Sequence, residues 1–300
     1  MLGYVCVNET LKPKGFKTCR LKTVQSKGIS YLRDIGVQNV KLLKEILQWN
    51  ISHDIYMFRV ISDIIPLATH PDILAQYDWR WYEDEELLKL FSEVKDLCNE
   101  YQMRLSMHPD QFTVINSNNA KTVQNSITYL DYHAKILEAI GGQDMILHVG
   151  GVYNDKDLAM KRFIKVYEEL DGTIKEYLRL ENDDRSYSIS DVLAISELTG
   201  IPICYDYHHN RCLFNEPIDK QVMAAIVGSW KGRKPKMHMS SGFSHPRDRK
   251  HADYISKEDG VSLYELLEEW DMDIMVEAKR KEKATLRLMN QFKGLGGKYV

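Results

Sequence analysis

The 300-residue sequence lacks the patterns that define several large classes of protein. No apolar run reaches the roughly 20 residues needed to span a bilayer, and no basic start followed by an apolar segment marks a secretory signal. The five cysteines form no CxxC pair and no even framework, so we expect reduced thiols in a cytoplasmic protein. Neither GxGxxG nor GxxxxGK(S/T) occurs, which argues against an open nucleotide-binding sheet and a nucleotide cofactor.

The sequence also has little net charge, although its basic residues are clustered. A balance of 40 Lys and Arg against 43 Asp and Glu gives −3, which argues against non-specific binding of nucleic acid by a generally basic surface. Four basic residues, Lys231, Arg233, Arg247 and Lys279, lie close in sequence to histidine or glutamate residues at predicted strand ends. This clustering has two explanations. The residues are ordinary solvated charges in loops, or they bind an anionic substrate at one face of the fold. Their positions close to the candidate ligands favour the second explanation.

Short β-rich segments alternate with helical segments along the whole chain. Helical spacing is clear in Glu86–Tyr101, Thr122–Ile140 and Lys220–Ser229. The predicted strands are Leu2–Val7, Ile55–Ile61, a third that ends at His108, Asp144–Val149, Tyr177–Glu181, Ile203–Asp206, Lys236–Ser240 and Ile274–Ala278. Alternation of this kind indicates βαβ units and a parallel sheet. Eight such units without a linker or repeat predict an α/β protein with a single domain over residues 1–300, a (β/α)8 TIM barrel.

Residues that bind metals stand where six of these strands end. They are His108, His148, Glu181, Asp206, His238 and Glu277, and His209 follows in the loop after Asp206. The carboxyl ends of barrel strands meet at one face, where TIM-barrel active sites lie. Imidazole and carboxylate ligands without a thiolate suit zinc or manganese, and seven ligands exceed the needs of one tetrahedral ion. We therefore expect two or three ions.

Clustered divalent ions favour hydrolytic displacement at phosphorus, because one ion lowers the pKa of bound water while others stabilise the attacking and leaving oxygens. Two other chemistries stay open at this point. A metal-dependent sugar isomerase uses the same fold with fewer histidines. A glycosidase with two carboxylates would leave the histidines without a role.

Nine segments distributed along the chain carry a resemblance to a known family. The most specific are HPDQF (His108–Phe112), KMHMSS (Lys236–Ser241) and HADYI (His251–Ile255). The others are GYVCVN (Gly3–Asn8), RVISDIIPLATH (Arg59–His70), ILHVGG (Ile146–Gly151), LEND (Leu180–Asp183), YDYHH (Tyr205–His209) and VEAKRKE (Val276–Glu282). With these segments the chain resembles the UV damage endonucleases, metal-dependent DNA repair enzymes related in fold to endonuclease IV.

The resemblance implies a site with three divalent ions, usually manganese, with zinc, magnesium and cobalt as alternatives. Its ligands would be the seven residues above together with His251, which the strand-end pattern does not include. The catalytic residues would be Glu181 and Glu277, as bridging carboxylates, and Lys236. The resemblance also points to carboxylation of Lys236, which precedes His238 by two residues on the same strand face. An ammonium there would be repelled by the ions, whereas a carbamate would be a ligand; the alternative is an unmodified lysine at the lip of the barrel.

The resemblance extends to residues that contact DNA. Gln111 and Phe112 match the pair that the family inserts into the duplex at the lesion. An inserted aromatic ring unstacks and kinks DNA, and a damaged base step costs least to open. The other matches are to residues near the lesion or the substrate phosphates: Tyr4, Asn8 and His70. Asp110 departs from the glycine often found at its position.

We therefore expect a monomer that acts on damaged double-stranded DNA and not at a membrane. It would nick immediately 5′ of UV photoproducts (cyclobutane pyrimidine dimers and 6-4 photoproducts), with abasic sites as an additional substrate, through metal-activated hydroxide, leaving a 3′-hydroxyl and a 5′-phosphate. The candidate phosphate contacts are Lys231, Arg233, Arg247 and Lys279, whose local charge would make binding sensitive to salt. The alternatives are an abasic-site endonuclease like endonuclease IV, a sugar isomerase or epimerase, and a damage-binding protein with a degenerate site.

Overall fold

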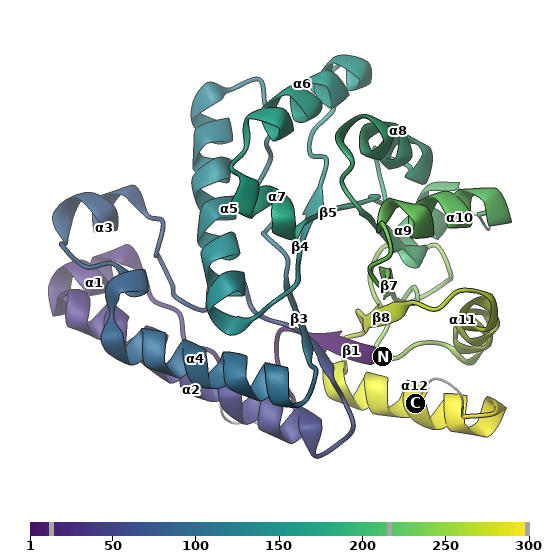
Figure 1. Cartoon of the computed structure of the whole chain (residues 1–300), viewed down its shortest axis with the longest axis horizontal. Coiled ribbons are helices and arrows are strands. Elements are labelled where there is room, and N and C mark those ends of the chain that lie inside the picture. The colour runs from purple at the N-terminus through teal and green to yellow at the C-terminus, as the bar shows by residue number, and fades with distance from the viewer. Residues whose placement is uncertain (12–14, 215–217, 298–300) are drawn as a thin grey trace.

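Eight short parallel strands close into a barrel in sequence order, which confirms the predicted (β/α)8 fold (Figure 1). The structure is a computed structural model that describes residues 1–11, 15–214 and 218–297. The strands are β1 (Leu2–Val5), β2 (Met57–Arg59), β3 (Arg104–Met107), β4 (Asp144–His148), β5 (Leu178–Glu181), β6 (Ile203–Asp206), β7 (Lys236–Met239) and β8 (Asp273–Val276). The ring closes where β1 pairs with β8, with Tyr4 beside Val276.

Helices cover the outside of the barrel (Figure 1). They are α1 (Leu21–Lys27), α2 (Ile29–Ile51), α3 (Pro71–Gln76), α4 (Glu85–Glu100), α5 (Ala120–Ile140), α6 (Lys156–Glu169), α7 (Gly172–Tyr177), α8 (Ile189–Thr199), α9 (Tyr207–Phe214), α10 (Lys220–Ser229), α11 (Lys257–Glu269) and α12 (Lys281–Leu295). The predicted bounds of α4, α5 and α10 are correct to within two residues. The short helices α1, α3, α7 and α9 were not predicted, because six to eight residues give too little periodicity.

Local hydrogen bonds explain where two helices next to the site begin. The Ser188 hydroxyl accepts from the Asp191 amide, and the Asp191 carboxylate accepts from the Ser188 amide. This capping box starts α8. At α9, the Asp206 Oδ1 atom accepts from the His209 amide at 2.7 Å, in the manner of an N-cap residue. His209 therefore lies on a helix, and the prediction that it lies in a loop is wrong.

The amino-terminal end of the barrel interior is filled by buried ion pairs. Arg104 donates to Asp144 at 2.9 Å and to Asp273 at 2.9 Å, and Arg179 donates to the other oxygen of Asp144 at 3.0 Å. Burial acts to raise the pKa of Asp144, but the nearby cations Arg104, Lys236 and Arg179 lower it to about 2. A fully paired ionic layer of this kind holds β3, β4, β5 and β8 in register beneath the functional face.

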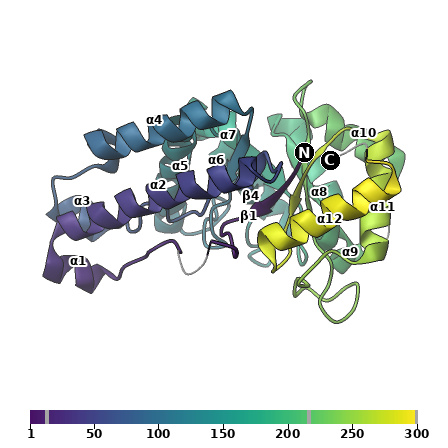
Figure 2. The ribbon, with the colours of Figure 1, turned by 90° about the horizontal axis from the view of Figure 1, so that it is seen from below.

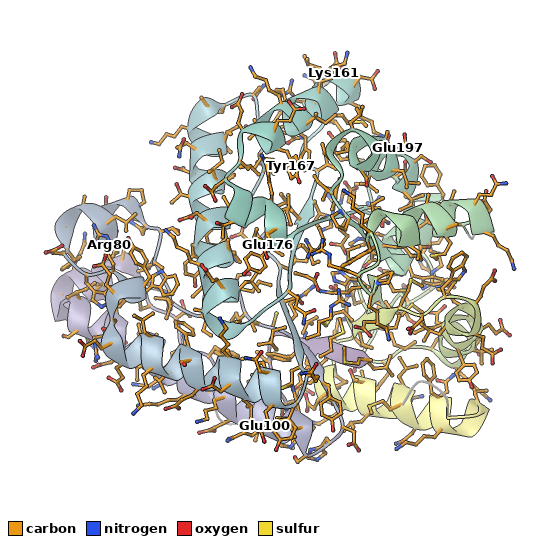
Figure 3. All side chains as sticks on the ribbon, in the orientation of Figure 1. Arg80, Glu100, Lys161, Tyr167, Glu176 and Glu197 are labelled. Carbon is orange, nitrogen blue, oxygen red and sulfur yellow. The ribbon has the colours of Figure 1, made fainter. Side chains whose placement is uncertain are left out.

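The first helices extend to one side of the barrel. In Figures 1 and 2, α1 and α3 lie at the far left, and the long helices α2 and α4 connect them with the strands. Charged residues such as Glu100, Lys161 and Glu197 project outward from the helix layer (Figure 3). In the described part of the chain, no helix combines the length and apolar character needed to cross a membrane.

Candidate functional site

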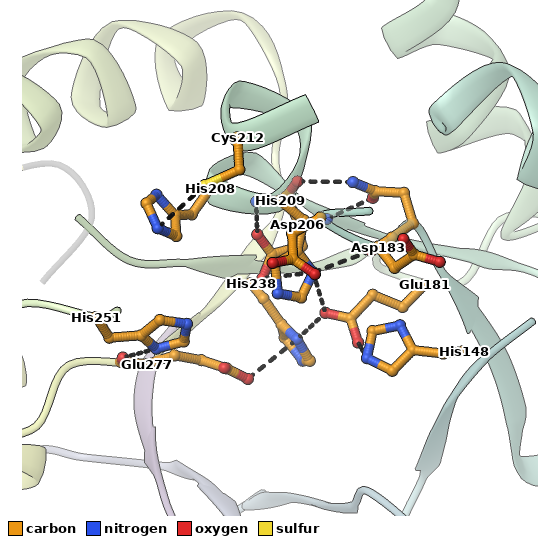
Figure 4. Close-up of polar contacts among 12 residues, drawn as sticks. His148, Glu181, Asp183, Asp206, His208, His209, Cys212, His238, His251 and Glu277 are labelled. Atoms are coloured by element: carbon orange, nitrogen blue, oxygen red, sulfur yellow. Dashed lines mark hydrogen bonds and ion pairs between the residues drawn. The ribbon is translucent and has the colours of Figure 1, made fainter. Parts of the chain in front are cut away.

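The carboxyl ends of the strands bring the predicted metal ligands together. Glu181 and His148 lie on one side, His251 and Glu277 on the other, and Asp206, His209 and His238 between them (Figure 4). Three sets of side chains each place their ligand atoms within 4.8 Å of one another: His108, His148 and Glu181; Glu181, Asp206 and His209; and Asp206, His238 and Glu277. Glu181 belongs to the first two sets, and Asp206 belongs to the last two. The arrangement is therefore three adjacent candidate metal sites joined by two shared carboxylates.

Glu181 is the centre of this cluster. Its Oε2 atom lies 2.9 Å from His108 Nε2 and 3.3 Å from His148 Nε2, and its Oε1 atom lies 2.6 Å from His238 Nδ1. The side chain is buried, which opposes its ionisation, but His238, His148 and His108 lower its pKa well below the ordinary value. Glu181 is thus a buried carboxylate that stays ionised and faces three imidazoles.

The second shared carboxylate differs from the one predicted. Glu181 and Glu277 were expected to bridge, but Glu277 belongs to one set and forms an ion pair with Arg59. Burial, together with the charges of Glu181 and Glu277, raises the pKa of Asp206 to about 7 despite His209. Burial lowers the pKa of His209, but Asp206, Glu181 and Glu277 raise it to about 9. Both pKa values are raised in part by neighbouring carboxylates, so the site is crowded with negative charge, which favours the binding of cations.

Residues next to the cluster hold the ligands in orientation. Asn182 donates to the Asp206 carbonyl at 3.0 Å, accepts from the Asp206 amide at 2.9 Å, and its own carbonyl lies 3.0 Å from His209 Nδ1. The Nδ1 atoms of His108 and His251 likewise lie 2.9 Å and 2.7 Å from the carbonyls of Pro109 and Glu277. A hydrogen bond from Nδ1 to a carbonyl leaves Nε2 free to bind a metal. Asn182 and Arg59 belong to the segments that carry the resemblance, but the sequence does not reveal these roles, because orientation depends on three-dimensional contacts.

Unpartnered polar atoms provide a test of whether these residues fit metal ions. Among the described residues, His238 Nε2, Asp206 Oδ2 and His148 Nδ1 are buried without a hydrogen-bond partner. Buried polar atoms are almost always satisfied, so a cluster of unsatisfied donors and acceptors needs an explanation. Imidazole and carboxylate atoms are ligands for zinc, manganese and related divalent ions. The residues therefore fit a multinuclear metal centre.

Lys236 lies in the barrel interior next to this centre. It is 1% exposed at the start of β7, and its Nζ atom has no hydrogen-bond partner in the described parts of the chain. Burial lowers its pKa to about 8, although Asp144 and Cys204 act in the opposite direction. This burial agrees with the predicted position of Lys236 on the same strand face as His238. It does not agree with the alternative, an unmodified Lys236 at the lip of the barrel.

The connection from β3 to α5 carries an exposed aromatic side chain. Phe112 is 77% exposed, and Gln111 beside it is also exposed. The Asp110 Oδ1 atom accepts from the Phe112 amide at 2.7 Å, which forms an Asx turn. Asp110 thus shapes the turn that carries Phe112, a role that its divergence from glycine did not reveal. His70 caps α3 and lines, together with Phe112, a cavity of about 570 Å³.

Two predicted phosphate contacts lie on the wrong side of the barrel. Lys231 and Arg233 lie between α10 and β7, in a connection that leads into the amino end of a strand. Their neighbour Lys234 pairs with Asp271 and Asp273 there. Arg247 follows β7 and Lys279 follows β8, so both lie on the same face as the cluster. The prediction that all the basic clusters share one face is therefore wrong.

Tyr4 and Asn8 also differ from their predicted positions. Gly3 and Val5 point into the barrel, so Tyr4 points outward, where it is fully buried and donates to Asn50 Oδ1 of α2 at 2.6 Å. Asn8 is 3% exposed and donates to the Tyr4 hydroxyl at 2.9 Å. Both residues join β1 to α2. The prediction that they line the DNA side of the pocket is wrong.

The fold and the site together are those expected of a metal-dependent enzyme of the (β/α)8 barrel class, with candidate metal sites at the carboxyl ends of the strands. The family model described as UV-endonuclease UvdE matches residues 1–297. The UV DNA damage endonuclease of Bacillus velezensis is 35% identical over 262 residues, which cover 84% of this chain and 79% of that protein. The chain belongs to the UV-endonuclease UvdE family.

Solved structures agree with this assignment. The crystal structure of SacUVDE matches with a TM-score of 0.88 and 32% identity over 99% of both chains. Endonuclease IV from Thermus thermophilus matches with a TM-score of 0.59 and 12% identity, over 83% of this chain and 92% of that chain. A D-tagatose 3-epimerase-like protein has a TM-score of 0.57 at 14% identity, over 81% and 89% of the two chains. The last two show a shared fold alone, because one barrel supports many chemistries.

Proposed function

We propose that the protein is an endonuclease that nicks duplex DNA immediately 5′ of UV photoproducts by metal-dependent hydrolysis, leaving a 3′-hydroxyl and a 5′-phosphate. One observation carries the proposal: the connection after β3 joins the ligand cluster to an exposed aromatic ring. His108 contacts Glu181 at 2.9 Å, and Phe112, four residues later, is 77% exposed. An exposed ring beside the ligands suits stacking on a nucleic-acid base. Relatives at 35% identity are UV DNA damage endonucleases.

The three ligand sets would hold three divalent ions, with His251 completing the set around Glu277. Such ions lower the pKa of water and stabilise the charge that develops on phosphate oxygens. The mixture of imidazole and carboxylate without thiolate supports manganese, with zinc, magnesium and cobalt as the alternatives. Glu181 and Asp206 would set the spacing between neighbouring ions. Arg59 keeps Glu277 ionised and aligned through their ion pair.

Selection of damaged DNA would depend on the turn that carries Gln111 and Phe112. A cavity of about 360 Å³ is lined by Gln111 of this turn, by His148 and by Tyr153. It offers room for a displaced nucleotide beside the ligand cluster. Inserting Phe112 into the stack costs a few kcal/mol, and the cost is smallest where a photoproduct has already weakened the stack. The ring would thereby admit distorted DNA more readily than intact DNA.

Lys236 would be carboxylated in the active protein. Its neutral amine would add to carbon dioxide with loss of a proton, giving a carbamate that is anionic near the cations. The support is its complete burial, the absence of a hydrogen-bond partner for Nζ among the described residues, and a pKa lowered to about 8. NMR of protein equilibrated with ¹³C-bicarbonate should give a carbamate signal that Lys236→Ala abolishes. An identical signal from this variant would contradict the assignment.

Four matched duplexes test the proposed activity: one with a cyclobutane dimer, one with a 6-4 photoproduct, one with an abasic site, and one undamaged. We expect a single nick 5′ of each photoproduct and extension of its 3′ end by a polymerase without further processing. His148→Ala should bind the dimer duplex but not nick it. Nicking of the abasic duplex alone would favour an activity like that of endonuclease IV and would overturn the proposal.

A further inference from the structure

A second exposed aromatic side chain lies on the same face of the barrel. The connection between β7 and α11 folds into a hairpin in which Gly242 pairs with His251 as an antiparallel bridge. The Phe243 amide donates to the Lys250 carbonyl at 2.7 Å and continues this pairing. The Phe243 side chain is 54% exposed. More than half of this side chain is therefore accessible from solvent on the functional face.

Two lysines from different segments approach the Phe243 ring. Lys250 Nζ lies 4.3 Å and Lys279 Nζ 4.5 Å from the ring centroid. Within the described residues, neither ammonium lies within ion-pair distance of a carboxylate, although acidic side chains occur nearby on the hairpin. Cation–π contacts at exposed sites hold such a ring only weakly. The group therefore offers a partly exposed aromatic ring and two positive charges that lack a carboxylate partner among the described residues.

The position of this group relative to Phe112 follows from the topology. In a closed ring of eight strands, β7 lies four places from β3, so their connections stand on opposite sides of the barrel mouth. The ligand cluster lies between them. His251 of the hairpin is 2.7 Å from the Glu277 carbonyl, and the Lys279 amide donates to the Ala252 carbonyl at 3.0 Å. Phe243 thus flanks the cluster on the side that Phe112 does not reach.

We propose that Phe243, Lys250 and Lys279 form a second DNA-binding element, called here the hairpin clamp. The Phe243 ring stacks on an unstacked base of the damaged duplex, and the two ammonium groups bind the adjoining phosphates. This inference rests on the proposed function, because only a nucleic acid that crosses the cluster reaches both aromatic rings. Stacking on an aromatic ring tolerates any base, so the clamp adds affinity without demanding a sequence.

Binding to a product duplex tests the clamp independently of catalysis. A dimer duplex that is already nicked 5′ of the lesion has no bond left to cut, so metal-loaded protein can be titrated to equilibrium by fluorescence anisotropy. Phe243→Ala should weaken binding about 5- to 150-fold, and Phe243→Trp should restore it. A Lys250→Ala, Lys279→Ala double variant should reduce the slope of log affinity against log salt by about 1.4–1.8, which corresponds to two phosphate contacts.

Matched variants on the opposite face serve as controls. Tyr101→Ala removes an exposed aromatic side chain, and Lys231→Ala removes an exposed ammonium, both at the amino ends of the strands. Neither should change affinity or salt slope. A 2-aminopurine placed next to the lesion should be less fluorescent in the complex with the native protein than in the complex with Phe243→Ala, because only the native ring stacks on it. This optical signature reports stacking and would not respond to a structural role.

The possible results distinguish a failure of the hairpin clamp from a failure of the proposed activity. If Phe243→Ala binds the nicked duplex as tightly as the native protein while Phe112→Ala binds it more weakly, the clamp is wrong and the activity stands. If Phe243→Ala loses nicking rate but not affinity, the ring acts through His251 and the clamp is again wrong. If native protein nicks none of the four duplexes, the proposed activity fails whatever the binding result.

Discussion

Replacing Phe112 by alanine should separate recognition of damage from hydrolysis. The ring is 77% exposed in the free protein, so its loss should change the free energy of unfolding by less than about 0.5 kcal/mol. In the complex, stacking on a base contributes about 1–3 kcal/mol. Affinity for a dimer duplex should therefore fall about 5- to 150-fold, while the metal content stays unchanged.

The assay compares two substrates with the same lesion. One is a fully paired duplex with a cyclobutane dimer, and the other carries the dimer within a short mismatched bubble. The bases of the bubble are already unstacked, so the Phe112 ring is needed less to open the stack. Phe112→Ala should therefore nick this substrate at nearly the native rate. Single-turnover nicking and anisotropy would be measured on both, with Phe112→Trp as the conservative control.

Two results would refute this reasoning. If Phe112→Ala bound and nicked the paired duplex as the native protein does, the ring would not contribute to opening the stack at the lesion. An equal loss on paired and bubble substrates would mean that Phe112 supports the cluster through the β3 connection and does not open the stack.

Three further predictions address the frame, the metal centre and the turn. Asp144→Asn should lower the free energy of unfolding by about 3–5 kcal/mol in urea titrations at pH 7, because it leaves buried Arg104 and Arg179 without this partner. In native protein the Asp144 pKa of about 2 lies below its ordinary 3.8, so its ionised form stabilises the fold above about pH 4. That contribution should disappear as the pH falls towards 2, and an unfolding curve that is flat over this range would contradict it. Glu181→Gln should retain less bound metal than Glu277→Gln when both are measured by mass spectrometry, because Glu181 belongs to two ligand sets. The nicking rate of Glu181→Gln should fall more than about 100-fold. Full metal content in this variant would argue against a bridging role for Glu181. Asp110→Ala should weaken dimer binding about 2- to 10-fold, the effect of one lost hydrogen bond to the Phe112 amide, and tighter binding would instead mean that the carboxylate repels DNA.

The fold could be predicted because its signal is repeated eight times. Each β-rich segment alternates with a helix long enough to show periodicity, as in α4 and α5, so individual errors of boundary do not change the topology. Helix α9 could not be found in this way, because its eight residues follow β6 without a break. Its start depends on a side chain, the Asp206 carboxylate that accepts from the His209 amide. Such a contact between a candidate ligand and the backbone is not visible as a pattern of hydrophobicity.

Two predictions about site residues are wrong because they do not follow from the strand direction and strand alternation of the predicted barrel. Strand ends place His108 and Glu181 at the carboxyl face, but the same rule places residues that precede a strand, such as Lys231, at the opposite face. Similarly, strand alternation assigns Tyr4 to the helix side when Gly3 faces the interior. In a barrel, the direction of the strand decides the face on which a residue lies, and proximity in sequence to a ligand does not.

The identity of the second shared carboxylate could not be predicted from residue types, because it depends on a competing cation. Glu277 follows β8 and lies in the cluster, but an ion pair with Arg59 of β2 partly neutralises its charge. Among the described residues, Asp206 pairs with no arginine or lysine: its Oδ1 atom caps α9, and its Oδ2 atom lies 3.7 Å from His209 Nδ1 without a hydrogen-bond donor. The oxygen left over by the cap is the one that can face two neighbouring ions. Arg59→Met should therefore release Glu277 and change the metal stoichiometry. Asn182→Ala should lower metal affinity about 10- to 100-fold, because it loosens Asp206 and His209 together.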